Sequence, residues 1–207
     1  LSKTSFDCSN VGANTVTLTV TDNNGNTATC IATVTVEDNV DPTALCQSVT
    51  VQLNAAGTAS VTAAQIDNGS SDACGIASMT VSPNAFGCAN TGANTVTLTV
   101  TDNNGNVGTC AATVTVEDNI APTLANCPRN QVLTADPVTC TAVATWTAPT
   151  GSDNCSAVVT QTSGQASGSS FAIGGPYGVR YIATDPSGNT SAPCLFTITV
   201  NAPPVTA

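Results

Sequence analysis

A stretch of 35 residues occurs twice in this chain, with an offset of 80 residues. Residues 5–39 and 85–119 differ at only seven positions, and both contain the segment "VTLTVTDNNGN". A third, diverged copy, "FAIGGPYGVRYIATDPSGNTSAPCLFTITV", keeps the same order of strand, Asp-x-x-Gly-Asn turn, cysteine and strand. Self-similarity at a fixed period is typical of repeat architectures, so the chain is predicted to be a tandem array.

The joints between repeats are marked by three related segments, "EDNVDPT", "EDNIAPT" and "VNAPPVT". They predict four segments: the C-terminal part of a repeat (1–39), a complete repeat (40–119), a complete variant repeat (120–201) and the start of a further linker (202–207). Because the pattern starts in the middle of a repeat, we interpret the chain as an internal piece of a longer secreted protein.

Alternation of apolar and threonine residues predicts strands. In "TVTLTVT", Val16, Leu18 and Val20 share one face, and the turn that follows joins two strands as a hairpin. Further strands are expected upstream of each hairpin, at 45–53, 58–64 and 76–82, and at 129–134, 140–147 and 157–163. Short antiparallel strands at this spacing predict an all-β fold, with immunoglobulin-like Greek-key β-sandwiches joined end to end.

Charge and composition exclude several classes of protein. Three Lys and Arg residues against thirteen Asp and Glu give a net charge of −10, which opposes binding to nucleic acid. The chain has no histidine, which excludes catalysis and zinc binding that depend on that residue. No segment has the ~18 consecutive apolar residues of a membrane span. We expect no enzymatic activity.

Two other classes remain as alternatives. Paired carboxylates such as Asp153 could serve glycoside hydrolysis, but they stand in turn motifs. A carbohydrate-binding module would need exposed aromatic residues, for which Tyr177 and Tyr181 are the candidates. The single tryptophan, Trp146, shares a strand face with alanines and is expected in the core.

Acidic residues gather at one end of each predicted sandwich. Three segments are expected to meet there: the joint, the loop between the second and third strands ("DNGSSDACG" or "GSDNC") and the Asp-x-x-Gly-Asn hairpin tip. Hard oxygen ligands without histidine favour Ca²⁺. The alternative is that Asp and Asn are only turn formers. If a structural Ca²⁺ stiffens each joint, its candidate ligands are Asp38, Asn39, Asp67, Asp72, Asp102, Asp118, Asn119, Asp153, Asn154 and Asp185. In this hypothesis Asp22, whose upstream joint is missing, is left without an ion.

Ten cysteines without a C-x-x-C pair favour disulfides over zinc and indicate an oxidising compartment. In this fold the first strand of each sandwich begins near the last strand. Cys46–Cys110 and Cys127–Cys194 are therefore predicted pairs. Elimination then predicts Cys74–Cys88 and Cys140–Cys155. Cys8 and Cys30 are expected either to have lost partners upstream or to pair with each other.

The segment "CPRNQVLTADPVTCTAVATWTAPTGSDNC", with the later "RYIATDPSGNTSAPCLFTITV", resembles a hyalin repeat (HYR) domain over residues 121–201. Residues 1–120, with motifs such as "ALCQSVTVQLNAAG" and "TVTVEDN", resemble the tandem repeats of giant SprB-type surface adhesins of gliding Bacteroidetes. The resemblance implies β-sandwiches, type IX export, attachment to the outer membrane and contact with motility or secretion machinery.

The expected function is therefore that of a secreted cell-surface adhesin or filament, in which a calcium-stiffened array takes part in attachment and gliding motility. Its expected partners are neighbouring repeats of the same chain and an extracellular surface or glycan ligand. The alternatives are a passive stalk that only spaces other domains and a carbohydrate-binding module.

Overall fold

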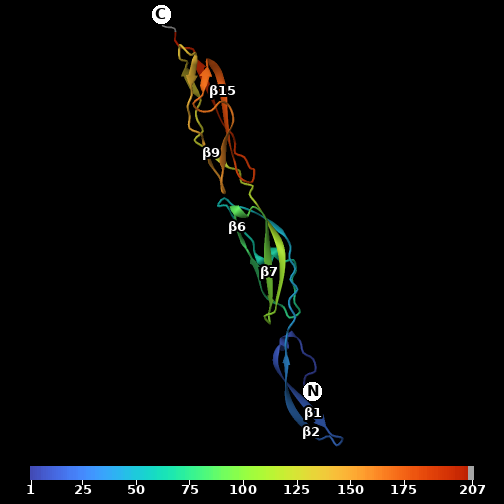
Figure 1. Cartoon of the computed structure of the whole chain (residues 1–207). Helices are drawn as coiled ribbons and strands as arrows, with labels where there is room; N and C mark the ends of the chain where they lie inside the picture. The colour runs from blue at the N-terminus through green and yellow to red at the C-terminus, as the bar shows by residue number, and fades with distance from the viewer. Residues whose placement is uncertain (205–207) are drawn as a thin grey trace. The chain divides into compact units, whose positions relative to one another are not determined.

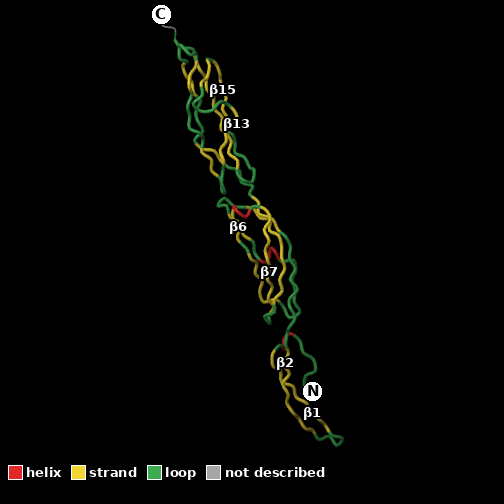
Figure 2. Tube along the Cα trace, in the orientation of Figure 1, coloured by secondary structure: helices red, strands yellow, loops and turns green. Residues whose placement is uncertain are grey.

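A computed structural model describes residues 1–204, and its secondary structure is almost entirely β (Figure 2). Helix is confined to one α-helical turn, α1 (Ala63–Ile66), and two 3-10 turns, η1 (Cys8–Asn10) and η2 (Cys88–Asn90). The strands are β1 (Gly12–Thr21), β2 (Thr27–Val36), β3 (Val49–Gln52), β4 (Thr58–Ser60), β5 (Ile76–Ser82), β6 (Ala85–Gly87), β7 (Gly92–Asp102), β8 (Val107–Glu117), β9 (Thr123–Ala125), β10 (Gln131–Thr134), β11 (Thr141–Val143), β12 (Thr150–Ser152), β13 (Val158–Ser163), β14 (Ser170–Ala172), β15 (Gly174–Thr184) and β16 (Cys194–Asn201).

Two four-stranded sheets have the same strand order, β3-β8-β7-β5 and β10-β16-β15-β13. In the second sheet, β10 runs parallel to β16, whereas β15 is antiparallel to both β16 and β13. A separate pair accompanies each sheet, β4 with β6 and β11 with β14. Pairing of the first strand of each sheet with the last is the Greek-key order of an immunoglobulin-like sandwich, so the predicted all-β fold class is confirmed.

Contacts divide the described chain into two compact units. The first contains residues 1–49, 60–85 and 93–115, and the second contains residues 50–59, 86–92 and 116–204. In the first unit, β1 and β2 form a hairpin of ten residue pairs, from Gly12 opposite Val36 to Thr21 opposite Thr27. Strand β5 pairs antiparallel with β7, whose Leu98 is fully buried.

The core of the second unit lies between β15, β16 and the strands that face them (Figure 1). Alternate residues of β16, among them Phe196 and Ile198, point into this core, as period-two alternation predicts. Trp146 packs edge-on against Phe196 with ring centroids 5.2 Å apart, and its Nε1 donates to the Tyr181 hydroxyl at 3.0 Å. Trp146 is therefore partly buried and packs against this core, as expected of a core-facing ring.

Three predicted strands are clearly shorter in the structure. The strand expected at 45–53 covers only Val49–Gln52. The strand expected at 58–64 ends at Ser60, because Thr62 and Gln65 form a capping box that starts α1, with the Thr62 N–H donating to Gln65 Oε1 at 2.8 Å. The strand expected at 140–147 covers only Thr141–Val143. Within residues 1–204, no helix is long and apolar enough to cross a membrane.

Replacement of Ile198 by alanine tests the core of the second unit. The side chain is fully buried, so Ile198→Ala should lower the free energy of unfolding by about 2–5 kcal/mol. Leu195→Ala is the matched control, because Leu195 lies on the same strand with 63% of its surface exposed and should change stability by less than about 0.5 kcal/mol. Urea denaturation of both variants measures the difference. Equal losses would contradict the described facing of β16.

Candidate metal centre

The three Asp-x-x-Gly-Asn tips form the same turn. The Asp102 carboxylate accepts hydrogen bonds from the backbone N–H groups of Asn104 and Asn106 at 2.8 Å, and from the Asn106 side-chain amide at 2.8 Å. Asp22 and Asp185 accept equivalent bonds from the residue four positions further along, through its backbone N–H and its side chain. These carboxylates are therefore occupied by their own turns, as turn formers would be.

The three carboxylates differ in burial, but the pKa of each is shifted in the same direction. Burial raises the pKa of Asp102 and of Asp185, but the hydrogen bonds from the turn outweigh it and hold each pKa below its ordinary value. The turn bonds from Asn26 likewise lower the pKa of Asp22, which is exposed. All three are ionised at neutral pH.

In the two later copies, the last asparagine of the tip also donates a hydrogen bond to the joint segment. The Asn106 side-chain amide donates to the backbone carbonyl of Asp38 at 3.0 Å, and the Asn189 amide donates to that of Asp118 at 2.9 Å. Both acceptors lie in the joint segments "EDN", so the tip holds the joint through asparagine rather than through aspartate. In the first copy, Asn26 donates to Asp22.

Two pairs of aspartates come together at the joints. The carboxylate oxygens of Asp38 and Asp72 lie within 4.8 Å of each other, and the same is true of Asp118 and Asp153. Two ligands of one Ca²⁺ ion, each at 2.3–2.6 Å, lie no more than about 5 Å apart, so both pairs are close enough to share an ion.

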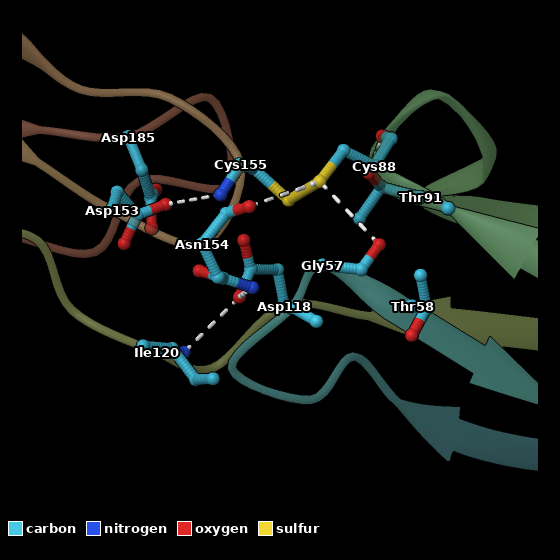
Figure 3. Close-up of a disulfide and its surroundings, with 12 residues drawn as sticks. Gly57, Thr58, Cys88, Thr91, Asp118, Ile120, Asp153, Asn154, Cys155 and Asp185 are labelled. Atoms are coloured by element: carbon cyan, nitrogen blue, oxygen red, sulfur yellow. Dashed lines mark hydrogen bonds between the residues drawn. A yellow bond between two sulfur atoms is a disulfide. The ribbon is translucent and has the colours of Figure 1, made fainter.

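The second pair leaves buried oxygens without a hydrogen-bond partner. Among the described residues, these atoms are Asp118 Oδ2, Asp153 Oδ1 and Asn154 Oδ1, with Asp38 Oδ2 at the first pair. Asp118 is only 4% exposed, and its other oxygen accepts from the Ile120 N–H at 3.2 Å and from the Asn154 amide at 3.1 Å (Figure 3). A buried carboxylate oxygen without a donor is costly unless a cation neutralises it, so this arrangement fits a metal ion.

The cysteines beside these pairs do not supply a ligand. Cys74 and Cys155 lie close enough to the aspartates, but each forms a disulfide, and a metal-binding cysteine must be a free thiolate. Their backbone N–H groups instead donate to Asp72 at 2.7 Å and to Asp153 at 3.0 Å. The candidate centre therefore offers only oxygen ligands, which suits Ca²⁺ rather than zinc.

The other predicted ligands have other partners in the structure. Asp67 accepts from the backbone N–H of Ser70 at 2.9 Å and closes its own loop. The Asn119 amide donates to Gln52 at 2.6 Å and to Glu117, and the Asn39 amide donates to Glu37 at 3.5 Å. Asn106 and Asn189 were not among the predicted ligands, although the tips that they end were expected at the joints and their fixed place in each tip was a signal.

Four disulfides are present, and two of them differ from the prediction. Cys46 pairs with Cys110 and Cys127 with Cys194, as the nearness of the first and last strands indicated. The predicted pairs Cys74–Cys88 and Cys140–Cys155 are wrong, because the structure pairs Cys8 with Cys74 and Cys88 with Cys155. The suggested Cys8–Cys30 pair is also absent, and Cys30 and Cys140 are exposed free thiols.

Elimination failed because it kept each pair inside one repeat. Cys8 and Cys88 occupy the same place 80 residues apart, and each reaches the Asp-x-Cys loop of the following repeat. The two bridges therefore link residues that the sequence assigns to successive predicted repeats, rather than two residues of one predicted repeat. Their sequence separations of 66 and 67 residues correspond to about 4 kcal/mol each in the chain-entropy model.

Residues 117–200 match the HYR domain family model. This match covers the second unit's sandwich, its joint segment and the Asp118–Asp153 pair. The resemblance to a hyalin repeat inferred from the sequence is thus confirmed for this part of the chain.

Two curated relatives are similar over most of the chain. The chain is 35% identical over 195 residues to hyalin of Strongylocentrotus purpuratus, which covers 90% of the chain and 16% of that protein. It is 34% identical over 200 residues to hyalin of Lytechinus variegatus, which covers 92% of the chain and 37% of that protein. The chain thus spans well under half the length of these relatives.

Solved structures with a similar arrangement of strands include extracellular domains of protocadherins. Mouse PcdhgC3 EC1-3 has a TM-score of 0.36 at 13% identity, covering 91% of this chain and 77% of that one. Fibronectin(III)-like modules of Clostridium thermocellum CbhA have a TM-score of 0.29 at 16% identity, covering 83% and 84%. At these scores, neither supports an argument about function.

Acid should weaken the tip turn of the third repeat. Because the folded-state pKa of Asp185 is lowered, its stabilising effect is complete above the ordinary pKa of about 4 and is lost as the pH falls through the folded value. Asp185→Asn should therefore destabilise the protein at pH 7 by about 1–3 kcal/mol, since its amide group faces the Asn189 amide donor. Once the pH falls below that folded value, the variant and the parent should converge.

Thermal melts of this variant between pH 2 and pH 7 measure the effect, with Asp22→Asn as the control, because Asp22 makes the same turn in an exposed position. A difference from the parent that stays constant over the whole pH range would contradict the assignment.

Peptide mapping should identify the inter-repeat bridges. After free thiols are alkylated without reduction, we expect linked peptides for Cys8–Cys74 and Cys88–Cys155, and alkyl groups on Cys30 and Cys140. A protease of broad specificity is needed, because the chain has only three Lys and Arg residues. Recovery of a Cys74–Cys88 peptide would show that the bridges close within one repeat.

Proposed function

We propose that this chain is a structural segment of an extracellular surface fibre, in which β-sandwich repeats are held end to end by a disulfide and a Ca²⁺ ion at each joint. The observation that carries this proposal is the group of unpartnered buried oxygens of Asp118, Asp153 and Asn154 beside the Cys88–Cys155 bridge. The bridge limits the motion of the loop, and an ion would neutralise the carboxylates that face it. Together they would stiffen the array.

The joint between 40–119 and 120–201 offers more contacts than a flexible linker would. In the second unit, the Asn154 amide donates to the carbonyl of Asn54 at 3.3 Å and to Asp118. The Asn189 amide donates to the carbonyl of Asp118 from the other side. These bonds, the disulfide and the candidate ion would all restrain the same short segment, as a stiff joint requires.

The attachment function belongs to the same proposal. Relatives named hyalin and the disulfides support an extracellular setting with adhesion-type repeats. Gliding motility, outer-membrane attachment and type IX export are proposed on the resemblance of residues 1–120 to bacterial surface adhesins alone. In this view neighbouring repeats are the first partners, and an extracellular surface or glycan is the ligand.

The alternative of a carbohydrate-binding module has less support. Tyr181 is 7% exposed and bonds Trp146 and Gln161, while the half-buried Tyr177 donates to the carbonyl of Ala172. Neither ring is presented to solvent as a sugar platform. A passive stalk remains compatible with the joint, since a stiff joint serves spacing as well as attachment.

Calcium binding tests the proposal directly. After removal of metal with EGTA, titration with millimolar CaCl₂ should give binding heat with a Kd of roughly 10⁻⁴–10⁻³ M. The corresponding stabilisation is on the order of 1 kcal/mol, or about 2–4 °C in Tm. The double variant Asp118→Asn, Asp153→Asn should lose the part of this response that belongs to the second joint.

The control is Asp136→Asn, because Asp136 lies in a turn outside both joints and its pKa is lowered by bonds from Thr139 and Val138. It should leave calcium binding unchanged. If neither binding heat nor a rise in Tm is observed for the parent chain, the calcium part of the proposal is wrong. The disulfide-held joint would then stand alone.

A further inference from the structure

The third repeat carries an exposed free thiol at its outer end. Cys140 is the last residue of the turn between β10 and β11, and its φ of 56° lies in the left-handed region that few residues other than glycine adopt. The turn is closed by the Asp136 N–H, which donates to Thr141 at 2.8 Å, and by the Cys140 N–H, which donates to Asp136 at 2.9 Å.

A turn of the same kind, one residue shorter, occurs in the preceding repeat with glycine in place of cysteine. There the Asn54 N–H donates to Thr58 at 3.0 Å, and the Gly57 N–H donates to Asn54 at 2.8 Å. The residue before each turn bonds the last strand of its sheet in the same way, Leu53 to Glu117 and Ala135 to Asn201. Gly57, with a φ of 70°, and Cys140 therefore occupy equivalent places.

Gly57 lies against the bridge to the next repeat (Figure 3). A Cβ added there would be 2.8 Å from Cys88 Sγ and 2.7 Å from the Asn154 carbonyl oxygen. This turn position thus touches both the sulfur that forms the bridge and the Asp-x-Cys loop that receives it. While Cys88 supplies the sulfur, only glycine fits beside it.

The third repeat reverses this arrangement. Phe86 and Phe171 are buried at the same step of the two repeats, but the η2 turn with Cys88 has no counterpart after Phe171, where the exposed Ile173 leads into β15. The repeat that lacks this cysteine is the one whose turn carries Cys140. The two repeats therefore carry this cysteine on different, neighbouring segments at the same end of the sandwich.

We propose that the outer end of the third repeat, formed by residues 136–140 and Ile173, is a docking surface for a further repeat of this kind, and that Cys140 forms a disulfide with the cysteine of that repeat's Asp-x-Cys loop. The occupant is inferred from the chain itself, because the equivalent end of the repeat 40–119 receives the loop 153–155 in this way. Ala202, two residues after the buried Val200, stands where Asp118 follows the buried Val116. This joint would therefore be independent of calcium.

The bridge forms by thiol–disulfide exchange with a small-molecule disulfide such as oxidised glutathione. The Cys140 thiolate attacks one sulfur of the oxidant and releases one glutathione thiolate, which leaves a mixed disulfide on Cys140. The thiolate of the incoming loop then attacks Cys140 Sγ and releases the second glutathione thiolate. Two protein thiols are oxidised, and one glutathione disulfide is reduced to two thiols.

The first experiment extends the chain by one repeat. Residues 1–206 are followed directly by a second copy of residues 124–204 that carries Cys140→Ser, and the protein is oxidised in a glutathione buffer containing EGTA. Peptide mapping should show Cys140 of the first copy linked to Cys155 of the added copy. Cys140→Ser in the first copy should leave that Cys155 as a thiol, whereas Cys30→Ser should change nothing.

An added repeat that forms its own Cys127–Cys194 bridge but keeps its Cys155 reduced, or links it to Cys30, would overturn the proposal. Because EGTA is present throughout, a failure of calcium binding in the earlier titration does not affect this result.

The second experiment needs no added repeat. In the chain of 207 residues, residues 54–57 are replaced by residues 136–140, "DPVTC", together with Cys88→Ser. If the turn itself delivers the sulfur, the grafted cysteine should pair with Cys155. The matched control has "DPVTS" at the same place and should leave Cys155 free to react with an alkylating reagent. A free Cys155 in the first variant would refute the proposed role of the turn, even if the added repeat in the other experiment does not fold.

Discussion

The segment around Asp118 is held by one loop, residues 153–155, which is tied covalently to the η2 turn through Cys88. Cys155 forms the bridge, and Asp153 and Asn154 turn toward Asp118 in the connecting segment. Each sandwich has few large side chains to pack, since the whole chain contains four Phe, two Tyr and one Trp. Small cores give limited stability, and cross-links between repeats add to it where hydrophobic contact cannot.

Acidic residues serve two different purposes in this protein. Those of the hairpin tips, such as Asp102, accept hydrogen bonds from two backbone N–H groups and one asparagine amide of their own turn, and these bonds hold the pKa below its ordinary value. Those of the joints, such as Asp118, keep a buried oxygen without a donor. Charge alone does not separate the two groups. The two groups differ in the number of backbone N–H groups within reach of each carboxylate, and that number depends on the local fold.

Much of the fold could be predicted from the sequence, because period-two alternation reports directly which face of a strand is buried. The strands and the hairpins followed from it, whereas the pairs Cys46–Cys110 and Cys127–Cys194 followed from the nearness of the first and last strands. The capping box at Thr62 and the short β11 did not, since a few local hydrogen bonds there override strand propensity. The HYR resemblance of residues 121–201 rested on the order of many weak motifs, and that order survives divergence.

The candidate site was predicted as a region, but only the tertiary structure selected its atoms. The sequence by itself determined the 80-residue period, the β-sandwich class and the gathering of carboxylates at the joints, because these follow from spacing and alternation along one chain. It left open which carboxylates are occupied by turns and which cysteines meet across a joint. The cysteines of the two unforeseen bridges lie 66 or 67 positions apart, and elimination within one repeat could not pair them. Only the folded joint brings Cys88 to Cys155 and Asp118 to Asp153, because the end of one sandwich and the loops of the next meet in space and not in sequence.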